Sequence, residues 1–151
     1  MGQDIRLETR SDARLLGAIR GLVRCYVGSF GFRSERVDEV VLAVDEACAN
    51  AIRHAYGGRK DRKLELTLRD EDGWIAIAVR DSGRPAPLER VQRKRLGARG
   101  AETLRPGGLG VHFMYRVFDE VAFEPGARRG NRVTMRLKCP KARRADARQE
   151  E

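Results

Sequence analysis

The sequence has few aromatic residues and no long hydrophobic segment, and each absence argues against a class of function. Aromatic residues make up 6% of the 151 residues, and no strand interleaves them with basic residues, which disfavours a nucleic-acid-binding domain. No apolar run approaches the roughly 20 residues that a transmembrane helix requires. The N-terminal segment MGQDIRLETR lacks the apolar centre of a secretory signal. We therefore expect a cytoplasmic protein that does not enter a membrane.

Cysteines are also scarce and are not paired. The three of them, Cys25, Cys48 and Cys139, form an odd set without a Cys-x-x-Cys motif. Cys25 and Cys48 fall on the faces of expected helices, where we expect buried free thiols. This usage fits a reducing compartment.

Basic residues, in contrast, exceed acidic ones by 31 to 22, which gives a net charge of +9. Much of the excess lies in residues 59–63, 84–105 and 138–148. Such a charge suits an acidic partner or a nucleic acid, but a basic sequence bias without a dedicated role accounts for it equally well. We expect residues 1–138 to form a single domain and residues 139–151 to form a disordered basic tail.

The hydrophobic periodicity predicts strands that pair as hairpins and helices that are grouped together. Expected strands cover residues 5–9, 64–68, 74–79, 121–123 and 133–137. One helix follows a cap at Ser11 or Asp12 and ends at Gly31, a second runs from a cap at Ser34 to Gly57-Gly58, a short basic helix covers 88–96, and a third long helix begins near Leu109. A Rossmann fold would need strands that alternate with helices. We therefore predict an α+β two-layer sandwich, with helices on one face of a mainly antiparallel mixed sheet.

The second expected helix carries two organised faces. Its apolar stripe consists of Val37, Val40, Val41, Val44, Cys48, Ala51, Ile52 and Ala55. Roughly opposite, Glu46 and Asn50 lie one turn apart among the small residues Ala43, Ala47 and Ala49, which would let a ligand approach closely. Taken alone, a Glu/Asn pair at this spacing is more typical of a solvated surface.

A second candidate site, Asp81-Ser82-Gly83, follows a strongly predicted strand. The carboxylate of Asp81 can accept a hydrogen bond from an amino group of a ligand, and Gly83 permits close backbone approach. An ordinary turn is the alternative explanation of these three residues.

The third candidate site is the segment 105–110, RPGGLG, which leads directly into an apolar helix. Glycines at a helix N-terminus present free N–H groups and the positive end of the helix dipole, so the segment suits a phosphate. It is not a Walker loop, because no Gly-Lys-Ser/Thr follows.

Together, the three patterns occur in an order that resembles the N, G1 and G2 boxes of the Bergerat-fold ATPases, the GHKL superfamily. The stretches DEACANAIRHAY, AVRDSGRP and RPGGLGVHFM carry this resemblance, which extends from about residue 5 to residue 138. Within the superfamily, the short chain is similar to the anti-sigma-factor serine kinases of bacterial stress and sporulation control. One departure is Pro85, in a region where many relatives have a second glycine after Asp81-Ser82-Gly83.

The resemblance implies a role for each residue of the three boxes. Asn50 is expected to hold Mg²⁺ through its side-chain oxygen, and Glu46 to act as the base toward the attacking hydroxyl. Asp81 is expected to bind the adenine amino group, with Gly83 leaving space for the base. The remaining implied ATP contacts are Arg105, Gly107, Gly108 and Gly110 at the phosphates and Met114 near the base, although a core position explains Met114 equally well.

The resemblance also implies a function. The expected protein is an ATP-binding anti-sigma factor that phosphorylates a serine of a STAS-type anti-anti-sigma partner and binds a sigma factor. Members of the family pair as dimers, and the first helix and strand could supply that surface. The alternative within the same fold is a non-catalytic, ATP-dependent protein-binding switch.

Overall fold

The computed structural model describes residues 4–87, 109–127 and 130–140. Their elements follow the order β1 (Ile5–Arg10), η1 (Ala13–Leu15), α1 (Leu16–Gly28), α2 (Ser34–Asn50), η2 (Ala51–Ala55), β2 (Lys63–Glu71), β3 (Trp74–Asp81), α4 (Leu109–Val117), β4 (Glu120–Ala127) and β5 (Gly130–Lys138). The expected basic helix over 88–96 and most of the glycine segment lie outside the described residues, as do residues 141–151 of the expected tail.

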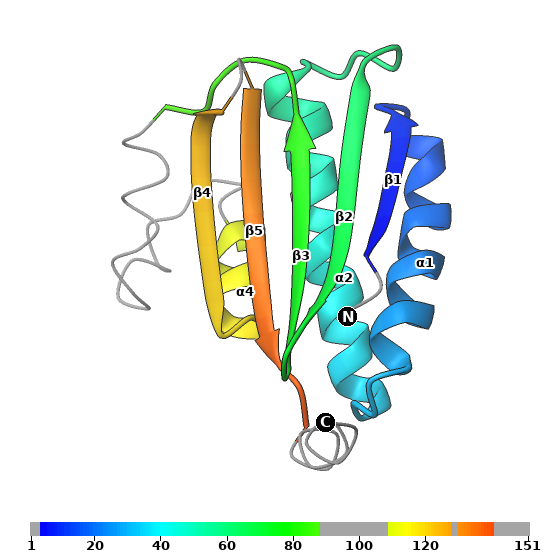
Figure 1. The fold of residues 1–151 in the computed structure, drawn as a ribbon. Helices are drawn as coiled ribbons and strands as arrows, with labels where there is room; N and C mark the ends of the chain where they lie inside the picture. The colour runs from blue at the N-terminus through cyan, green and yellow to red at the C-terminus, as the bar shows by residue number, and fades with distance from the viewer. Residues whose placement is uncertain (1–3, 88–108, 128–129, 141–151) are drawn as a thin grey trace.

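The strands of the described residues form one sheet in the order β1-β2-β3-β5-β4 (Figure 1). Asp72 and Gly73 join β2 to β3 with φ values of 29° and 82°, the positive values that a tight two-residue hairpin requires. The central strand β3 ends at Asp81, which lies directly opposite Asn131 of β5. This register places the end of the G1-like segment beside the start of the last strand.

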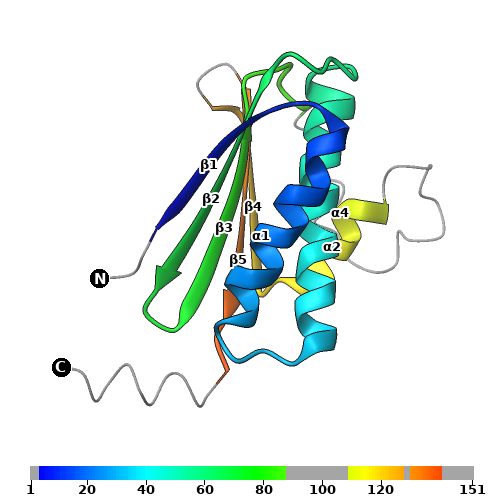
Figure 2. The same cartoon turned by 90° about the vertical axis from the view of Figure 1, so that its right-hand side faces the viewer.

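The helices form a second layer on one face of this sheet. Figure 2 shows α1, α2 and α4 on the same side, while the other face of the sheet is left open. The predicted two-layer α+β sandwich is therefore confirmed. Each of the four strand pairings among the described residues is antiparallel, so the sheet of this part of the chain is antiparallel rather than mixed.

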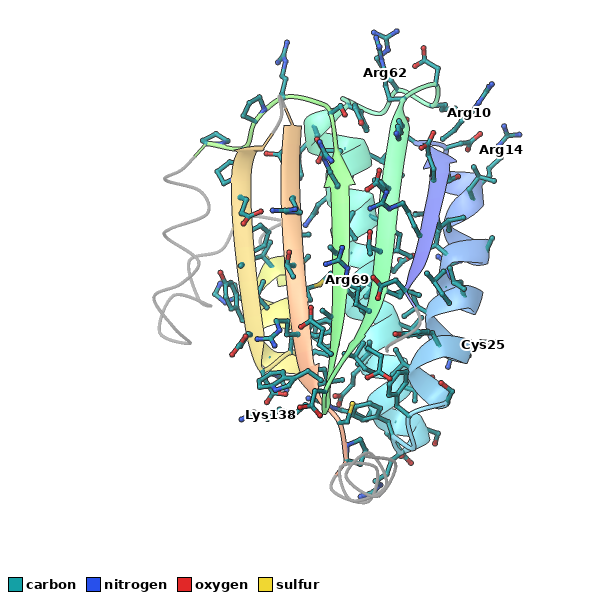
Figure 3. The ribbon with its side chains drawn as sticks, viewed as in Figure 1. Arg10, Arg14, Cys25, Arg62, Arg69 and Lys138 are labelled. Carbon is teal, nitrogen blue, oxygen red and sulfur yellow. The ribbon has the colours of Figure 1, made fainter. Side chains whose placement is uncertain are left out.

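The core lies between the two layers. The predicted apolar stripe of α2 faces it, and Val40, Val44 and Cys48 are each 0% exposed. Burial of a side chain such as valine or leucine contributes about 1.5–3 kcal/mol, so this stripe fixes α2 against the sheet. The sheet contributes alternating residues of the central strands, of which Leu66 is 1% and Ile77 is 0% exposed. Alternation places the charged residues on the open face, where Figure 3 shows Arg69.

Two local predictions are corrected by the structure. Ser34 is the first residue of α2 rather than its cap, because Arg33 takes the N-cap position with extended backbone. Cys25 is exposed on α1, whereas Cys48 is buried as predicted (Figure 3). Cys25 lies beside the stripe of Ile19, Val23 and Val27 that α1 buries, and not on it.

The predicted end of the second helix is more complex than a glycine stop. After Asn50 the helix widens into the π-helical turn η2, in which the N–H of Tyr56 donates to the carbonyl of Ala51 over 3.1 Å. Gly57 and Gly58 then end the helix with φ values of 58° and 80°. Single π-helical turns are frequent at functional sites.

Beyond β5 the chain stays attached to the β2–β3 turn, because the N–H of Cys139 donates to the carbonyl of Gly73 over 2.8 Å. In the part of the chain that the structure describes, no helix has the length and apolar character needed to cross a membrane.

Candidate functional site

A pocket of about 320 Å³ lies between the end of the second helix and the sheet. Its volume is at the lower end of the range of about 300–1,000 Å³ that is typical of small-molecule sites. One wall comes from α2 and η2, the other from β3, β4 and β5, and residues 84–87 and Val111 of α4 complete the lining. Asn50 and Asp81, predicted from two different motifs, are both part of this lining.

The helical wall carries the N-box residues. Asn50 lines the pocket, and Glu46 lies one turn earlier with a side chain that is 35% exposed. Arg53 connects the two, because its Nη2 donates to Oδ1 of Asn50 over 3.1 Å and lies 3.7 Å from Oε2 of Glu46. Of the small residues on this face, Ala47 lines the pocket, whereas Ala43 is 0% exposed and belongs to the core.

The start of α4 lies directly against Glu46. A Cβ atom added to Gly110 would lie 2.4 Å from Oε2 of Glu46, which is closer than two such atoms can approach. Glycine at position 110 therefore allows the carboxylate to rest against the first turn of α4. Through this contact, the structure brings together two residues that were predicted from separate motifs.

Asp81 lines the pocket from the end of β3 and is 6% exposed. Its Oδ1 accepts hydrogen bonds from the N–H of Gly83 over 2.9 Å and from Nδ2 of Asn131 over 3.0 Å. Desolvation by burial raises the pKa of Asp81 above 3.8, and the hydrogen bonds from Gly83 and Asn131 oppose that shift. A buried carboxylate with hydrogen-bonding capacity left on Oδ2 is suited to a ligand that donates from an N–H group.

Gly83 has a packing role that the sequence does not indicate. A Cβ atom at this position would lie 2.3 Å from the carbonyl oxygen of Ala55, and the N–H of Arg84 donates to the same oxygen over 3.0 Å. The close approach that Gly83 permits is thus between its own backbone and the end of η2. This contact holds the loop after β3 against the helical wall.

Two residues that bind this loop were not predicted from the sequence. The hydroxyl of Tyr56 donates to the carbonyl of Lys63 and accepts from the N–H of Ser82 over 2.7 Å, so it ties the G1-like loop to the start of β2. Asn131 binds both Asp81 and the segment after Gly83. Tyrosine at a helix end and asparagine after a glycine are common in any sequence, so neither gives a signal without the fold.

His54, which lies on η2, also lines the pocket. Met114 is 1% exposed and belongs to the core, and it is not among the described residues that line the pocket, so the alternative of a core methionine accounts for it. Arg105, Gly107 and Gly108 lie outside the described residues.

Asn50 is the predicted ligand of a divalent cation, and few other metal ligands lie near it among the described residues. Among the described residues there is no group of three or more acidic, histidine or cysteine side chains that could enclose a metal ion. Mg²⁺ bound with a nucleotide needs few protein ligands, because water and phosphate oxygens fill most of its six positions. The Oδ1 atom of Asn50 is a carbonyl oxygen of the kind that Mg²⁺ prefers, and in this structure it accepts a hydrogen bond from the guanidinium of Arg53.

Comparison with known proteins agrees with this arrangement. A family model described as the histidine kinase-like ATPase domain matches residues 9–137. The serine-protein kinase RsbW of Bacillus pumilus (strain SAFR-032) is 31% identical over 123 residues, which cover 78% of this chain and 75% of the relative. RsbW of Bacillus subtilis (strain 168) is 26% identical over 121 residues with the same coverage, 78% and 75%.

Solved structures share the fold. A crystal structure of the RsbU and RsbW domains of Rv1364c from Mycobacterium tuberculosis matches with a TM-score of 0.64 and 15% identity, over 91% of this chain and 32% of the other. A chain in the crystal structure of the SiaB–SiaC complex from Pseudomonas aeruginosa matches with a TM-score of 0.66 and 14% identity, over 88% of both chains. The solved structures agree in fold, and the family match together with the identity to RsbW shows that the chain belongs to the histidine kinase-like ATPase domain family.

Proposed function

We propose that this chain is an ATP-dependent protein serine kinase that also acts as an anti-sigma factor. The observation that carries the proposal is that Asn50 and Asp81, from two distant motifs, line one pocket of a size suited to a nucleotide base. The names of the similar RsbW proteins support the kinase activity. The proposed substrate is a serine of a STAS-type anti-anti-sigma protein.

In the proposed complex, the adenine of ATP occupies the pocket and donates from its amino group to Asp81. The phosphates extend past Asn50 toward Glu46 and the start of α4, where free N–H groups and the helix dipole favour negative charge. Arg105, Gly107 and Gly108 belong to the same proposed phosphate site. Gly83 acts indirectly, by keeping the loop after Asp81 against Ala55.

The proposed reaction transfers the γ-phosphoryl group to a serine hydroxyl. The serine Oγ forms a bond with the γ-phosphorus, the bond from that phosphorus to the bridging oxygen breaks, and ADP leaves with the electron pair. Glu46 accepts the proton of the hydroxyl, and its contact with Gly110 orients it for this role. General-base catalysis of this kind contributes about 10²–10⁴-fold to a rate.

Mg²⁺, held by Asn50, would neutralise charge on the transferring phosphates. The residue fits this role because its side-chain carbonyl oxygen is a ligand of the kind that Mg²⁺ prefers and because it lines the pocket. Arg53 would have to leave Oδ1 when the ion binds, and its side chain is 53% exposed, which leaves room for that movement.

The partners and the location complete the proposal. The resemblance to anti-sigma-factor kinases supports binding of a sigma factor and pairing of two copies of the chain, and the charge of +9 suits an acidic partner surface. We place the protein in the cytoplasm, where sigma factors act.

One observation favours the alternative, a non-catalytic switch that binds ATP and a partner. Arg53 donates to Oδ1 of Asn50 and lies 3.7 Å from Oε2 of Glu46, so it occupies the groups that a metal ion and an attacking hydroxyl would need. If Arg53 keeps this position in the ATP complex, these groups are not available for phosphotransfer and the transfer is slow. The two functions share the pocket and differ only in the chemical step.

ATP binding is the first test of the proposal. We expect calorimetry to show that the wild type binds ATP more tightly with Mg²⁺ than without it. Asn50→Ala is expected to weaken the Mg²⁺-dependent binding about tenfold or more, because the metal loses its protein ligand. If the wild type does not bind ATP under either condition, both the kinase and the switch are ruled out.

Phosphotransfer is the second test and separates the two functions. Labelled ATP, Mg²⁺ and the STAS-domain protein encoded nearest to this chain are expected to yield a labelled serine on that protein. Glu46→Gln is expected to reduce the transfer rate about 100-fold or more while ATP binding is retained. A wild type that binds ATP and forms a complex with the partner without labelling it would support the switch.

A further inference from the structure

The side chain of Asn131 makes polar contacts with Asp81, Arg84 and Ala86, in addition to the backbone pairing of Asn131 within the sheet. Asn131 is the second residue of β5 and the direct cross-strand neighbour of Asp81. Its Nδ2 donates to Oδ1 and Oδ2 of Asp81 over 3.0 and 3.3 Å and to the carbonyl of Arg84 over 2.8 Å. Its Oδ1 accepts from the N–H of Ala86 over 2.7 Å. One carboxamide thereby uses both its donors and its acceptor at the wall of the pocket.

These contacts fix the orientation of the carboxamide. The N–H of Ala86 can only donate, so it must face Oδ1 of Asn131, and Nδ2 must then face Asp81 and the carbonyl of Arg84. The backbone beneath is equally constrained, since a Cβ atom at Gly130 would lie 1.9 Å from the carbonyl oxygen of Asp81. The position of the amide relative to Asp81 is therefore set by the fold.

The first consequence concerns the carboxylate. Among the side-chain and loop donors that the structure describes, Gly83 and Asn131 donate to Oδ1 of Asp81 over 2.9 and 3.0 Å, whereas the contact of Asn131 with Oδ2 is longer, at 3.3 Å. Oδ2 is thus the oxygen with capacity for a ligand. Donors on Oδ1 also favour the ionised carboxylate, which can accept hydrogen bonds but cannot donate them.

The second consequence concerns the loop after β3. Arg84, Pro85 and Ala86 all line the pocket, and Asn131 binds the backbone on both sides of Pro85. A proline in this segment has no N–H of its own to anchor the chain. The carboxamide supplies the anchor instead, so the same side chain orients the acceptor and shapes the wall beside it.

We propose that Asn131 is a positioning residue that makes the pocket selective for a base with an exocyclic amino group. This inference rests on the proposed function, because it assumes that ATP binds with its base at Asp81. Asn131 keeps Asp81 an acceptor and leaves Oδ2 directed at the ligand. A base with a carbonyl group in place of the amine, as in inosine triphosphate, would place one acceptor against another and bind weakly.

The test uses Asn131→Asp, which keeps the shape of the side chain and replaces the amino donor with an oxygen. The new carboxylate would lie about 3 Å from Asp81, and two carboxylates this close share one proton. The other ionisable groups in the pocket lining are His54 of η2, Arg84 after β3, Glu124 of β4 and Arg132 of β5. They are present in both proteins, so their titration cancels when the variant is compared with the wild type.

We expect the wild type to bind ATP about tenfold or more tightly than inosine triphosphate, measured by calorimetry with Mg²⁺. Asn131→Asp is expected to weaken ATP binding and to reduce this preference. Its deficit relative to the wild type is expected to grow as the pH rises and the shared proton is lost. Asn131→Ala adds no charge but removes a donor that favours the ionised form of Asp81, so its loss of ATP binding is expected to become smaller as the pH rises, the opposite trend to that of Asn131→Asp.

Thr134→Val provides the matched control, because Thr134 lies on the same strand and faces the open side of the sheet. It is expected to bind both nucleotides as the wild type does. The inference is overturned if the wild type binds ATP but Asn131→Asp retains the same preference, or if its deficit is independent of pH. A wild type that binds neither nucleotide would instead overturn the proposed function.

Discussion

The two carboxylates of the site have different surroundings, and these surroundings match different tasks. Asp81 is 6% exposed and is bound by Gly83 and Asn131, whereas the side chain of Glu46 is 35% exposed and lies beside Arg53 and Gly110. A buried, fully oriented carboxylate is suited to recognition of a fixed ligand group. A more exposed carboxylate at the mouth of the site can exchange a proton with an incoming hydroxyl.

Gly110→Ala tests whether Glu46 acts from its observed position. The new methyl group would overlap Oε2 of Glu46, and the carboxylate would have to move because a flexible side chain yields more easily than a helix backbone. A displacement of about 1 Å at a reacting group can cost about 100-fold in rate. We expect phosphotransfer to fall by about that factor, while the melting temperature is maintained because alanine favours the helix.

Gly21→Ala is the matched control for this change. Gly21 lies within α1, and a Cβ atom added there would have no neighbour within 4 Å. Both substitutions should gain helix propensity of about 1 kcal/mol, but only Gly110→Ala should affect transfer. Full activity of Gly110→Ala would show that the contact between α4 and Glu46 is not needed.

At the scale of elements, the helical wall of the pocket was predictable and the wall opposite was not. The periodicity of α2 fixes which face is buried, and Glu46 and Asn50 follow from it because residues one turn apart are neighbours on any helix. The contact between Asp81 and Asn131 joins residues 50 positions apart and depends on the register of β3 with β5. A local pattern carries no information on such a register, so the sequence did not identify Asn131.

The π-helical turn η2 is a second feature that the sequence predicts only in part. The sequence predicted that the helix ends at Gly57-Gly58, which agrees with their positive φ values of 58° and 80°. It did not predict the wider turn before them, because that turn arises where Ala55 meets the backbone of Gly83 from a distant loop. Sequence reasoning thus located the motifs, and the fold determined how they touch.

Tyr56→Phe tests the connection between η2 and the loop after β3. The variant loses the hydroxyl that bonds the carbonyl of Lys63 and the N–H of Ser82, and this N–H is left without its acceptor in a partly buried place. An unsatisfied group of this kind costs about 1–3 kcal/mol. We expect urea unfolding to show a loss of that size, together with weaker ATP binding, because the loop carries Asp81.

Tyr115→Phe is the appropriate comparison, since Tyr115 packs on Phe123 and its hydroxyl has no hydrogen-bond partner among the residues that the structure describes. It should leave both stability and ATP affinity close to those of the wild type. Equal stability of the two variants would argue that the Tyr56 hydroxyl does not anchor the loop.

At the scale of the whole molecule, the sheet separates two environments. The face under the helices holds the core and the pocket, and the open face carries charged residues paired across strands, such as Arg136 with Glu71 at 3.2 Å. Partly exposed pairs of this type contribute little to stability, about 0–1 kcal/mol each. Asp81 differs from them because it brings a carboxyl group to the buried side, so its ionisation affects the stability of the entire fold.

The raised pKa of Asp81 determines the direction in which the stability of the fold changes with pH. Between the pKa of the unfolded chain, about 3.9, and the higher pKa of the folded protein, the folded state binds more protons than the unfolded state. Stability supplied by protonated Asp81 is therefore complete below the unfolded pKa and is lost as the pH rises through the folded pKa. Each tenfold difference in proton affinity corresponds to about 1.4 kcal/mol.

Asp81→Asn removes the titrating group, so the difference in unfolding free energy between the variant and the wild type measures the contribution of that group. We expect the free energy of unfolding of the variant, minus that of the wild type, to increase as the pH rises above the unfolded pKa of about 3.9 and to level off above the folded pKa of Asp81. ATP binding should be lost over the whole range, because the amide presents a donor where the ligand also donates. Thr134→Val, which removes no titrating group and lies on the open face of the sheet, should show no comparable trend when urea unfolding is measured at the same pH values. A constant difference between Asp81→Asn and the wild type would mean that Asp81 titrates alike in the folded and unfolded chains. The buried carboxylate is expected to lower stability in order to bind a nucleotide, and this experiment measures how much stability is lost.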